Sequence, residues 1–391
     1  MINNTKATNM YELIATATFG LEAVVRREVE GLGYEIIKTE DGKVTFAGDE
    51  RAIVRSNLWL RSADRVLLKA CEFDAFEFED LFQGIKAYPW EELIPADGKF
   101  TVTCSTVKSK LHNPPAIQSV SKKAVVERMS AAYGLDRFEE TGAEYTIKVT
   151  MLKDRATVTV DTSGSGLHKR GYRVASVDAP MKETLAAALV ELSFFKPGRV
   201  LVDPCCGSGT IPIEAAMIAM HIAPGLSRTF ACEDWDLIPA EMWKQERADA
   251  FASIVQPEDS PDGQPAFCIY ASDIDPKAVA AARENAAEAG VDEYIQFTRA
   301  DVKNLKPPVA EDRGIIITNP PYGERIGEQE EISGIFRALG RFCRENPQWS
   351  LFVITPDKDA EKKIMGRRAD RRRKLYNGNI ETTYYQFHGV K

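Results

Sequence analysis

Long apolar runs are missing from this sequence. No segment approaches the roughly 20 consecutive apolar residues that a membrane-spanning helix requires, and residues 1–10 (MINNTKATNM) lack the apolar core of a secretory signal. The seven cysteines are scattered and include no CxxC pair, which excludes a disulfide framework and a cysteine-rich zinc site. We therefore expect a cytoplasmic protein that binds no membrane and no metal. Its reduced and mostly buried thiols should include Cys71, Cys104, Cys232, Cys268 and Cys343.

An excess of basic residues is missing too. The formal net charge is −8 and the pI is near 5.4, so any nucleic-acid contact must come from local patches. The clearest basic patch comprises Arg367, Arg368, Arg371, Arg372, Arg373 and Lys374. A second comprises Lys108, Lys110, Lys122 and Lys123, which an ordinary solvated face explains equally well. A third, basic and aromatic, comprises His168, Lys169, Arg170, Tyr172 and Arg173.

A chain of 391 residues with 44% hydrophobic content can bury more than one core. The first part reads as strand 11–17, helix 21–31, hairpin 34–38 and 44–47, helix 50–58 and strand 65–71. This βαββαβ order predicts a small ferredoxin-like domain. A second α+β part follows, with helical turns at 76–85, strand 99–106, helix 117–133 and paired strands 145–151 and 156–161. Ser163–Gly166 (SGSG) then indicates a linker.

From about residue 180, helices alternate with apolar strands, which predicts an α/β fold with a parallel, doubly wound sheet. The expected helices are 181–195, 210–220 and 241–252, and the expected strands are 199–202, 267–272, 294–299, 314–318 and 350–354. Asn377-Gly378 lies between two strand-like runs, 373–376 and 381–387, and predicts a hairpin. A parallel sheet that ends in an antiparallel hairpin resembles a class I methyltransferase domain.

A glycine-rich turn, DPCCGSGT, follows the first of these strands. Gly207 and Gly209 let the backbone approach a ligand closely, and the next helix offers free N–H groups to a carboxylate. A dinucleotide cofactor is the alternative, but Pro212 stands where that motif has its third glycine. Cys205 and Cys206 lie in the same turn, where we interpret them as small packing residues and not as nucleophiles.

Carboxylates follow the next two strands. Asp273 is placed to accept hydrogen bonds from both ribose hydroxyls of a nucleoside, and Asp275 before Pro276 is expected to cap a helix. Asp301 could accept a hydrogen bond from an adenine amino group, with a helix cap or a surface position as the alternative.

The fourth strand runs into Asn319-Pro320-Pro321-Tyr322. The lone pair of an exocyclic base amine is delocalised into the ring, so the amine is a poor nucleophile. The amide oxygen of Asn319 and the carbonyl of Pro320 can each accept one N–H, which localises the lone pair, while the prolines hold the backbone. Tyr322 can stack on a base that has been flipped out of its helix. A proline-rich turn alone would explain Pro320-Pro321, but not the whole motif.

Together, DPCCGSGTIPIEAA, SDIDP and TNPPYGER resemble the amino-methylating class I methyltransferases. HKRGYR followed by APMKETLAAALV is similar to the bacterial THUMP-containing family of 23S ribosomal RNA (guanine-N2)-methyltransferases. The resemblance covers nearly the whole chain, including an insertion at 221–265, whose role the sequence leaves open. It implies a ferredoxin-like domain (1–65), a THUMP domain (66–165), a basic linker (166–179) and a seven-stranded Rossmann-like methyltransferase domain (180–391).

The resemblance also implies the site. S-adenosylmethionine is the expected cofactor, with structured RNA as partner. The expected cofactor-binding residues are Asp203, Gly207, Gly209, Thr210, Asp273, Asp301 and Asn319, and the expected catalytic residues are Asn319, Pro320, Pro321 and Tyr322. The expected product is N2-methylguanosine in 23S rRNA. Relatives leave open a transfer-RNA guanine, an adenine-N6 target in RNA or DNA, or a non-catalytic RNA-binding factor.

Overall fold

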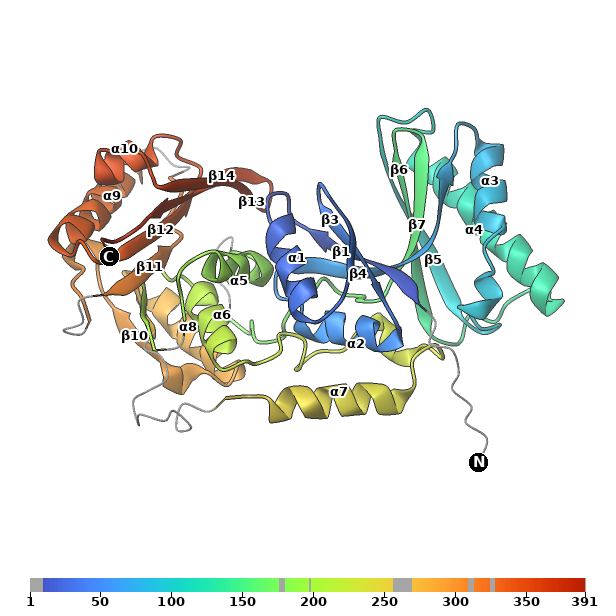
Figure 1. Cartoon of the computed structure of the whole chain (residues 1–391), viewed down its shortest axis with the longest axis horizontal. Coiled ribbons are helices and arrows are strands. Elements are labelled where there is room, and N and C mark those ends of the chain that lie inside the picture. The colour runs from blue at the N-terminus through green and yellow to red at the C-terminus, as the bar shows by residue number, and fades with distance from the viewer. Residues whose placement is uncertain are drawn as a thin grey trace. The chain divides into compact units, whose positions relative to one another are not determined.

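The computed structural model describes residues 10–175, 180–196, 198–255, 269–308, 313–323 and 328–390. Two seven-stranded sheets organise this part of the chain (Figure 1). Two compact units contain them. The first comprises residues up to 16 together with 26–167 and 229–248, and the second comprises 17–25, 168–228 and 249–391.

The first unit begins with the expected βαββαβ order. Its elements are β1 (Tyr11–Ala17), α1 (Glu22–Gly31), β2 (Ile36–Glu40), β3 (Lys43–Gly48), α2 (Glu50–Trp59) and β4 (Ala63–Asp74). The strand order β2-β3-β1-β4 confirms the ferredoxin-like fold. Asp49 starts α2 by accepting a hydrogen bond from the Ala52 amide at 2.9 Å.

The THUMP part continues the same sheet. It contains α3 (Phe78–Lys86), η1 (Trp90–Glu92), β5 (Lys99–Val107), α4 (Pro114–Tyr133), β6 (Glu144–Leu152) and β7 (Arg155–Asp161). Strand β7 pairs antiparallel with both β4 and β6, and β5 pairs parallel with β6. Helices α3 and α4 cover one face of these strands (Figure 1).

The insertion contributes to this first unit. It contains η2 (Ala231–Asp234) and α7 (Ala240–Ala252). Trp235 is buried, stacks on Tyr145 with 4.7 Å between ring centroids, and donates a hydrogen bond to the Glu144 carbonyl at 3.1 Å. The amide of Cys232 donates to the Thr162 carbonyl at 3.1 Å. The insertion therefore completes the core beside β6 and β7, which supplies the physical role that the sequence left open.

The second unit contains the doubly wound sheet that the sequence predicts from about residue 180. Its strands are β8 (Val200–Asp203), β9 (Ile269–Asp273), β10 (Ile295–Arg299), β11 (Gly314–Thr318), β12 (Ser350–Thr355), β13 (Arg371–Asn377) and β14 (Ile380–Phe387). Its helical elements are α5 (Glu183–Glu191), α6 (Thr210–Ala219), α8 (Pro276–Glu288), η4 (Asp292–Tyr294), η5 (Val302–Asn304), α9 (Glu328–Glu345) and α10 (Ala360–Met365). The order is β10-β9-β8-β11-β12-β14-β13, and β14 runs in the direction opposite to the other six strands of this sheet.

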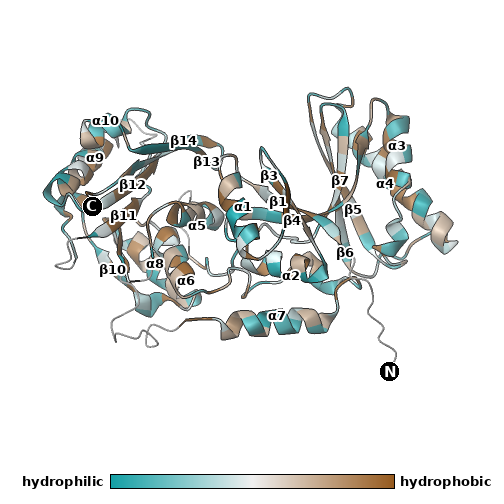
Figure 2. Ribbon diagram, viewed as in Figure 1, coloured by the Kyte–Doolittle hydropathy of each residue, from teal (hydrophilic) through white to brown (hydrophobic). Residues whose placement is uncertain are grey.

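Apolar residues fill both faces of this sheet. Leu201, Ile315 and Ile317 pack toward α5, α6 and α8, and their chain neighbours Val202 and Ile316 pack toward α9 and α10. This alternation buries the central strands on both sides, as a doubly wound sheet requires. Figure 2 shows the hydrophilic colour along the outer hairpin β13–β14. Among the described residues, we find no helix with the length and hydropathy needed to cross a membrane.

The expected basic linker has a different role from the one its composition indicates. Arg170 is 3% exposed and lies 3.4 Å from the Glu214 carboxylate on α6, and the Tyr172 hydroxyl donates to the same carboxylate at 3.0 Å. Both residues are buried in the methyltransferase unit, so the expectation that they contact RNA was wrong. Their charge and hydrogen bond compensate a buried carboxylate instead.

Candidate active site

The expected site turns lie at one edge of the second sheet. Strands β9, β8 and β11 are parallel neighbours, so their carboxyl ends meet at this edge. The chain leaves β8 toward β9 and later returns to the other side of β8 with β11. Ligands of open α/β sheets bind where the strand order reverses in this way.

The glycine-rich turn joins β8 to α6 through two left-handed residues. Gly207 has φ 53° and Gly209 has φ 84°, which favour glycine. A Cβ atom on Gly209 would lie 3.0 Å from the Ala282 Cβ of α8, so this glycine also permits close helix packing. No side chain caps the start of α6, so the first amides of this helix can bind a carboxylate.

Asp273 ties the turn to β9. Its Oδ2 accepts a hydrogen bond from the Gly207 amide at 3.0 Å, and its Oδ1 accepts one from the Asp275 amide at 3.0 Å. A carboxylate oxygen can accept two hydrogen bonds, so each retains capacity for a hydroxyl donor. The Asp275 side chain accepts from the Lys277 amide at 2.9 Å, which confirms that it caps α8.

Two further carboxylates, those of Asp203 and Asp301, belong to the same group of turns as Asp273 and Asp275. Asp203 is 1% exposed and accepts a hydrogen bond from the Cys205 amide at 3.2 Å. Burial, together with the negative charge of Asp273, raises the pKa of Asp203 to about 7. Asp301 accepts from the Lys303 amide at 2.8 Å and so caps η5, as the alternative interpretation of this residue expected.

The thiols of the turn are poor nucleophiles. Burial raises the pKa of Cys205 and Cys206 far above the ordinary thiol range, and the nearby Asp203 and Asp273 raise it further. Asp301 also acts on Cys205, so the three carboxylates converge around this side chain. These thiols remain protonated, which agrees with a packing role. In the described chain Cys71, Cys104, Cys232 and Cys343 are free thiols too, whereas Cys268 lies outside the described residues.

Asn319 follows the last residue of β11. Its Oδ1 is buried and has no hydrogen-bond partner in the described part of the chain. Pro320 is buried and Pro321 is exposed. A buried acceptor without a partner costs about 1–3 kcal/mol, which a donor entering the site recovers. The side chain is therefore free to accept a hydrogen bond from a ligand. Glu324 and Arg325 of the motif lie outside the described residues.

Tyr322 is held by a residue that sequence reasoning assigned only to a turn. The Asn377 side-chain amide, at the end of β13, donates to the Tyr322 hydroxyl at 2.9 Å. Burial raises the pKa of Tyr322, so its hydroxyl remains protonated. The two residues are 55 positions apart, and no spacing pattern predicts the contact. The hydrogen bond limits the orientations open to the Tyr322 ring.

Arg173 is a second residue whose position sequence reasoning missed. Its guanidinium contacts the Glu183 carboxylate at 2.8 Å, the Met181 carbonyl at 2.8 Å and the Thr210 hydroxyl at 3.3 Å. The structure thus moves Arg173 from the expected RNA-contacting linker to the start of α6.

The other basic patches are partly neutralised. Within the expected cluster on and before β13, Arg367 pairs with Asp370 at 3.2 Å, Arg372 with Glu361 at 3.6 Å and Lys374 with Glu381 at 2.7 Å. Arg368 and Arg371 are exposed and form no ion pair in the described regions. In the THUMP part, Lys122 lies 4.0 Å from the Glu140 carboxylate and Lys123 lies 3.7 Å from that of Glu127.

Comparison with known families completes this description. Residues 170–386 match the family model of the RMKL-like methyltransferase domain. The chain belongs to this methyltransferase family. Residues 12–67 of the chain match the family model of the RlmL ferredoxin-like domain, and residues 75–161 match that of the THUMP domain. The family and fold expected from the sequence motifs are thus confirmed.

Full-length relatives agree with the family. YpsC of Bacillus subtilis, provisionally named an RNA methyltransferase, is 46% identical over 379 residues, which cover 96% of each chain. Ribosomal RNA large subunit methyltransferase K/L of Syntrophotalea carbinolica is 35% identical over 393 residues, covering 96% of this chain and 53% of that protein. The chain therefore spans about half the length of this K/L relative.

Solved structures match over nearly the whole chain. SMU.472, provisionally named a methyltransferase and crystallised with SAH, is 40% identical with a TM-score of 0.90, and the match covers 98% of this chain and 100% of that one. A Listeria monocytogenes protein, provisionally named an N6-adenine-specific DNA methylase, is 43% identical with a TM-score of 0.90, covering 98% and 97%.

Proposed function

We propose that the protein transfers a methyl group from S-adenosylmethionine to the exocyclic N2 amine of a guanosine in RNA, with 23S ribosomal RNA as the substrate. The observation that carries this proposal is the buried Asn319 Oδ1 without a partner, at the end of β11. An amide oxygen in this position suits an amine N–H, because it accepts more strongly as the nitrogen becomes positively charged.

The cofactor fits the residues of the adjacent turns. The Asp273 carboxylate retains two acceptor positions for ribose hydroxyls, and Asp301 lies after β10 for the adenine amino group. The start of α6 has no side-chain cap, so the turn with Gly207, Gly209 and Thr210 can bind the methionine carboxylate. Asp203 stabilises this turn by accepting a hydrogen bond from the Cys205 amide. The cofactor supplies an electrophilic methyl group on a sulfonium.

The motif residues then prepare the acceptor. Asn319 Oδ1 and the Pro320 carbonyl accept the two amine N–H groups, and Pro321 restrains the backbone between them and Tyr322. The Tyr322 ring stacks on the base while Asn377 holds its hydroxyl. The amine nitrogen held in this way would take the methyl group from the bound sulfonium, whose sulfur would keep the electrons of the broken bond, and the extra proton on nitrogen would pass to solvent. Rate acceleration comes from orientation and hydrogen bonding.

RNA is the proposed substrate class because a THUMP domain precedes the methyltransferase domain and because relatives are named as RNA methyltransferases. The K/L name refers to RNA of the large ribosomal subunit, which supports 23S rRNA as the substrate, and a cytoplasmic location is part of this proposal. This name does not specify the methylated atom, and the Asn-Pro-Pro-Tyr motif recognises an amine without selecting a base. The choice of guanine-N2 therefore rests on the resemblance of HKRGYR and APMKETLAAALV to the guanine-N2 family.

Nucleoside mass spectrometry of a deletion strain tests the proposal. The strain should lack one N2-methylguanosine of 23S rRNA. A plasmid with the wild-type gene should restore this nucleoside, and a plasmid with Asn319→Ala should not. Loss of a methylated nucleoside from transfer RNA, or of N6-methyladenosine from RNA or DNA, contradicts the substrate while keeping the enzyme. Full restoration by Asn319→Ala contradicts the catalytic site.

A further inference from the structure

The hairpin β13–β14 ends beside the proposed base pocket. Thr355, the last residue of β12, pairs with Thr383, whereas β14 already begins at Ile380. Because β14 runs antiparallel to β12, its first residues and the end of β13 project past the carboxyl edge of the sheet, where the site turns lie. The hydrogen bond from Asn377 to Tyr322 agrees with this placement.

The loop between β1 and α1 is anchored on the same strand. Residues 17–25 belong to the compact unit that contains the methyltransferase sheet. The Arg373 guanidinium donates a hydrogen bond to the Gly20 carbonyl at 3.0 Å. A Cβ atom on Gly20 would lie 2.5 Å from the Lys374 carbonyl, and its φ is +91°, so only glycine fits there. Leu21 and Leu375 both belong to the buried core of this unit.

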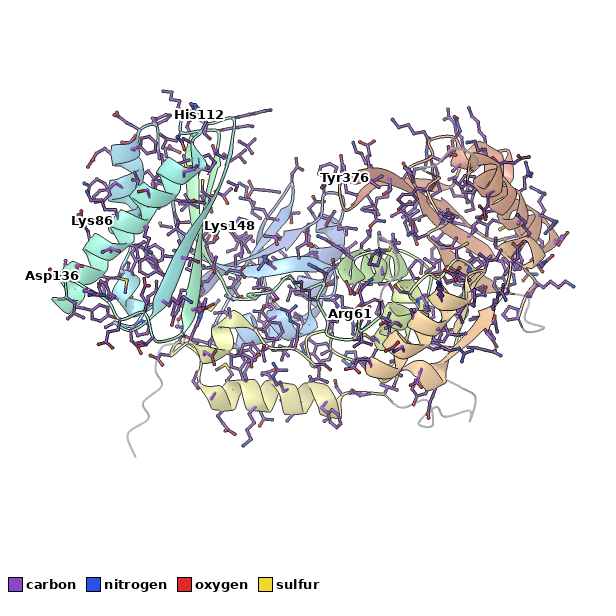
Figure 3. The ribbon with its side chains drawn as sticks, turned by 180° about the vertical axis from the view of Figure 1, so that it is seen from behind. Arg61, Lys86, His112, Asp136, Lys148 and Tyr376 are labelled. Atoms are coloured by element: carbon purple, nitrogen blue, oxygen red, sulfur yellow. The ribbon has the colours of Figure 1, made fainter. Side chains whose placement is uncertain are left out.

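This anchoring presents an aromatic pair. The Phe19 ring lies 6.2 Å from the Tyr376 ring at an interplanar angle of 78°, and Phe19 is 47% exposed. Tyr376, labelled in Figure 3, directly precedes Asn377 at the end of β13. The methyl-transfer chemistry uses neither ring. The fold therefore holds two aromatic rings close to the Tyr322 support without burying the Phe19 ring.

Cations accompany the pair. The Lys374 ammonium lies 5.5 Å from the Tyr376 ring centroid, and Arg371 on the same strand is exposed with no ion pair in the described regions. Aromatic rings beside cations bind unpaired nucleotides, because bases stack on the rings and the cations attract phosphates. When a target base is flipped out, its neighbours lose a stacking partner and need such a surface.

We propose that Phe19 and Tyr376 form a stacking platform for an unpaired nucleotide adjacent to the methylated base of the RNA. This inference rests on the proposed function, since it assumes that the base enters beside Tyr322. The platform binds substrate and takes no part in the chemistry. It makes the β1–α1 loop, which lies within the family's ferredoxin-like domain by sequence, a part of the RNA-binding surface.

Single substitutions in the full-length protein test the platform with unmodified 23S rRNA transcript as the probe. Phe19→Leu keeps an apolar side chain and removes the ring, so RNA affinity should fall about tenfold. Phe19→Trp should retain wild-type affinity. Phe251→Ala is the matched control, because Phe251 on α7 is 70% exposed, and it should bind RNA as wild type does. Binding of S-adenosylhomocysteine and the melting temperature should stay unchanged in all three variants.

A double-mutant cycle tests whether the rings act as one surface. Phe19→Leu and Tyr376→Leu together should weaken RNA binding by less than the product of the single effects. Wild-type RNA affinity in Phe19→Leu overturns the platform, and so does an equal loss of S-adenosylhomocysteine affinity, which indicates a folding defect. Binding measures the platform separately from methyl transfer. If the wild-type protein methylates no 23S rRNA but Phe19→Leu binds this RNA tenfold more weakly than wild type does, the result supports the platform and contradicts the proposed substrate.

Discussion

Replacing Asn319 with alanine should slow methyl transfer while leaving the folded protein intact. The Asn319 Oδ1 is buried and has no partner in the described chain, so alanine removes no hydrogen bond made by that oxygen. Removal of an unsatisfied buried acceptor is neutral or stabilising, whereas the loss of a satisfied one costs about 1–3 kcal/mol. The melting temperature of Asn319→Ala should therefore equal or exceed that of wild type.

The expected loss in rate follows from the charge that develops during transfer. The amine nitrogen becomes cationic as it accepts the methyl group, so its hydrogen bond to Asn319 strengthens in the transition state. Removing one preorganised group of this kind costs about 2.7–4 kcal/mol, or about 100- to 1,000-fold in rate. Because the interaction is weaker in the ground state, RNA and cofactor affinities should change only a few-fold.

Single-turnover methyl transfer with saturating cofactor measures the rate, and separate isotherms measure RNA and S-adenosylhomocysteine binding. Asn346→Ala is the control, because the Asn346 side chain donates to the Phe342 carbonyl at 2.9 Å at the end of α9 and has no role in the site. Asn319→Asp keeps an acceptor and adds a charge, so it should affect cofactor affinity as well. A wild-type rate in Asn319→Ala would show that the assigned site is wrong.

Three further predictions follow from buried charges. Arg170→Ala leaves Glu214, which is 0% exposed, without its cation, so the free energy of unfolding measured in urea should fall by about 3–5 kcal/mol. Lys169 is exposed, so Lys169→Ala should change this free energy by less than about 0.5 kcal/mol. Equal effects of the two substitutions would contradict the structural role of Arg170. The pKa of Asp203 is about 7 when folded and near 3.8 ordinarily, so its protonated form stabilises the fold below pH 4 and this contribution is lost as pH rises to 7. The unfolding free energy of Asp203→Asn relative to wild type should consequently rise by about 4 kcal/mol from pH 4 to pH 8, and parallel pH curves would disprove this. The Arg173 guanidinium contacts the Thr210 hydroxyl at the uncapped start of α6, where the methionine carboxylate is expected. Arg173→Lys should therefore weaken S-adenosylhomocysteine binding about tenfold in calorimetry but leave 5′-methylthioadenosine, which lacks the carboxylate, unchanged; an equal loss for both ligands contradicts a carboxylate contact.

Patterns that act over a few residues were readable from the sequence. The Asp275 cap, the Asn377-Gly378 turn and the alternation of apolar strands with helices depend on neighbouring positions. They located the expected elements to within a few residues, with α5 shorter than expected at Glu183–Glu191. Helices α9 and α10 were not among the expected elements. The start of the strand expected at 267 lies outside the described residues. The motif turns also followed from local order, because parallel strands bring their carboxyl ends to one edge.

Roles that depend on partners far along the chain were decided by the tertiary structure alone. The composition around Arg170 and Tyr172 predicts an RNA-binding linker, but in the structure both side chains bind the buried carboxylate of Glu214. The sequence assigns Asn377 only to a turn, but in the structure its side-chain amide donates a hydrogen bond to the Tyr322 hydroxyl. Composition reports that a cation or an amide is present, but not whether a buried partner already compensates it. The sequence by itself determined the elements, the fold class and the position of the motifs, while packing determined which polar groups stabilise the fold and which, like Asn319 Oδ1, are left for a ligand.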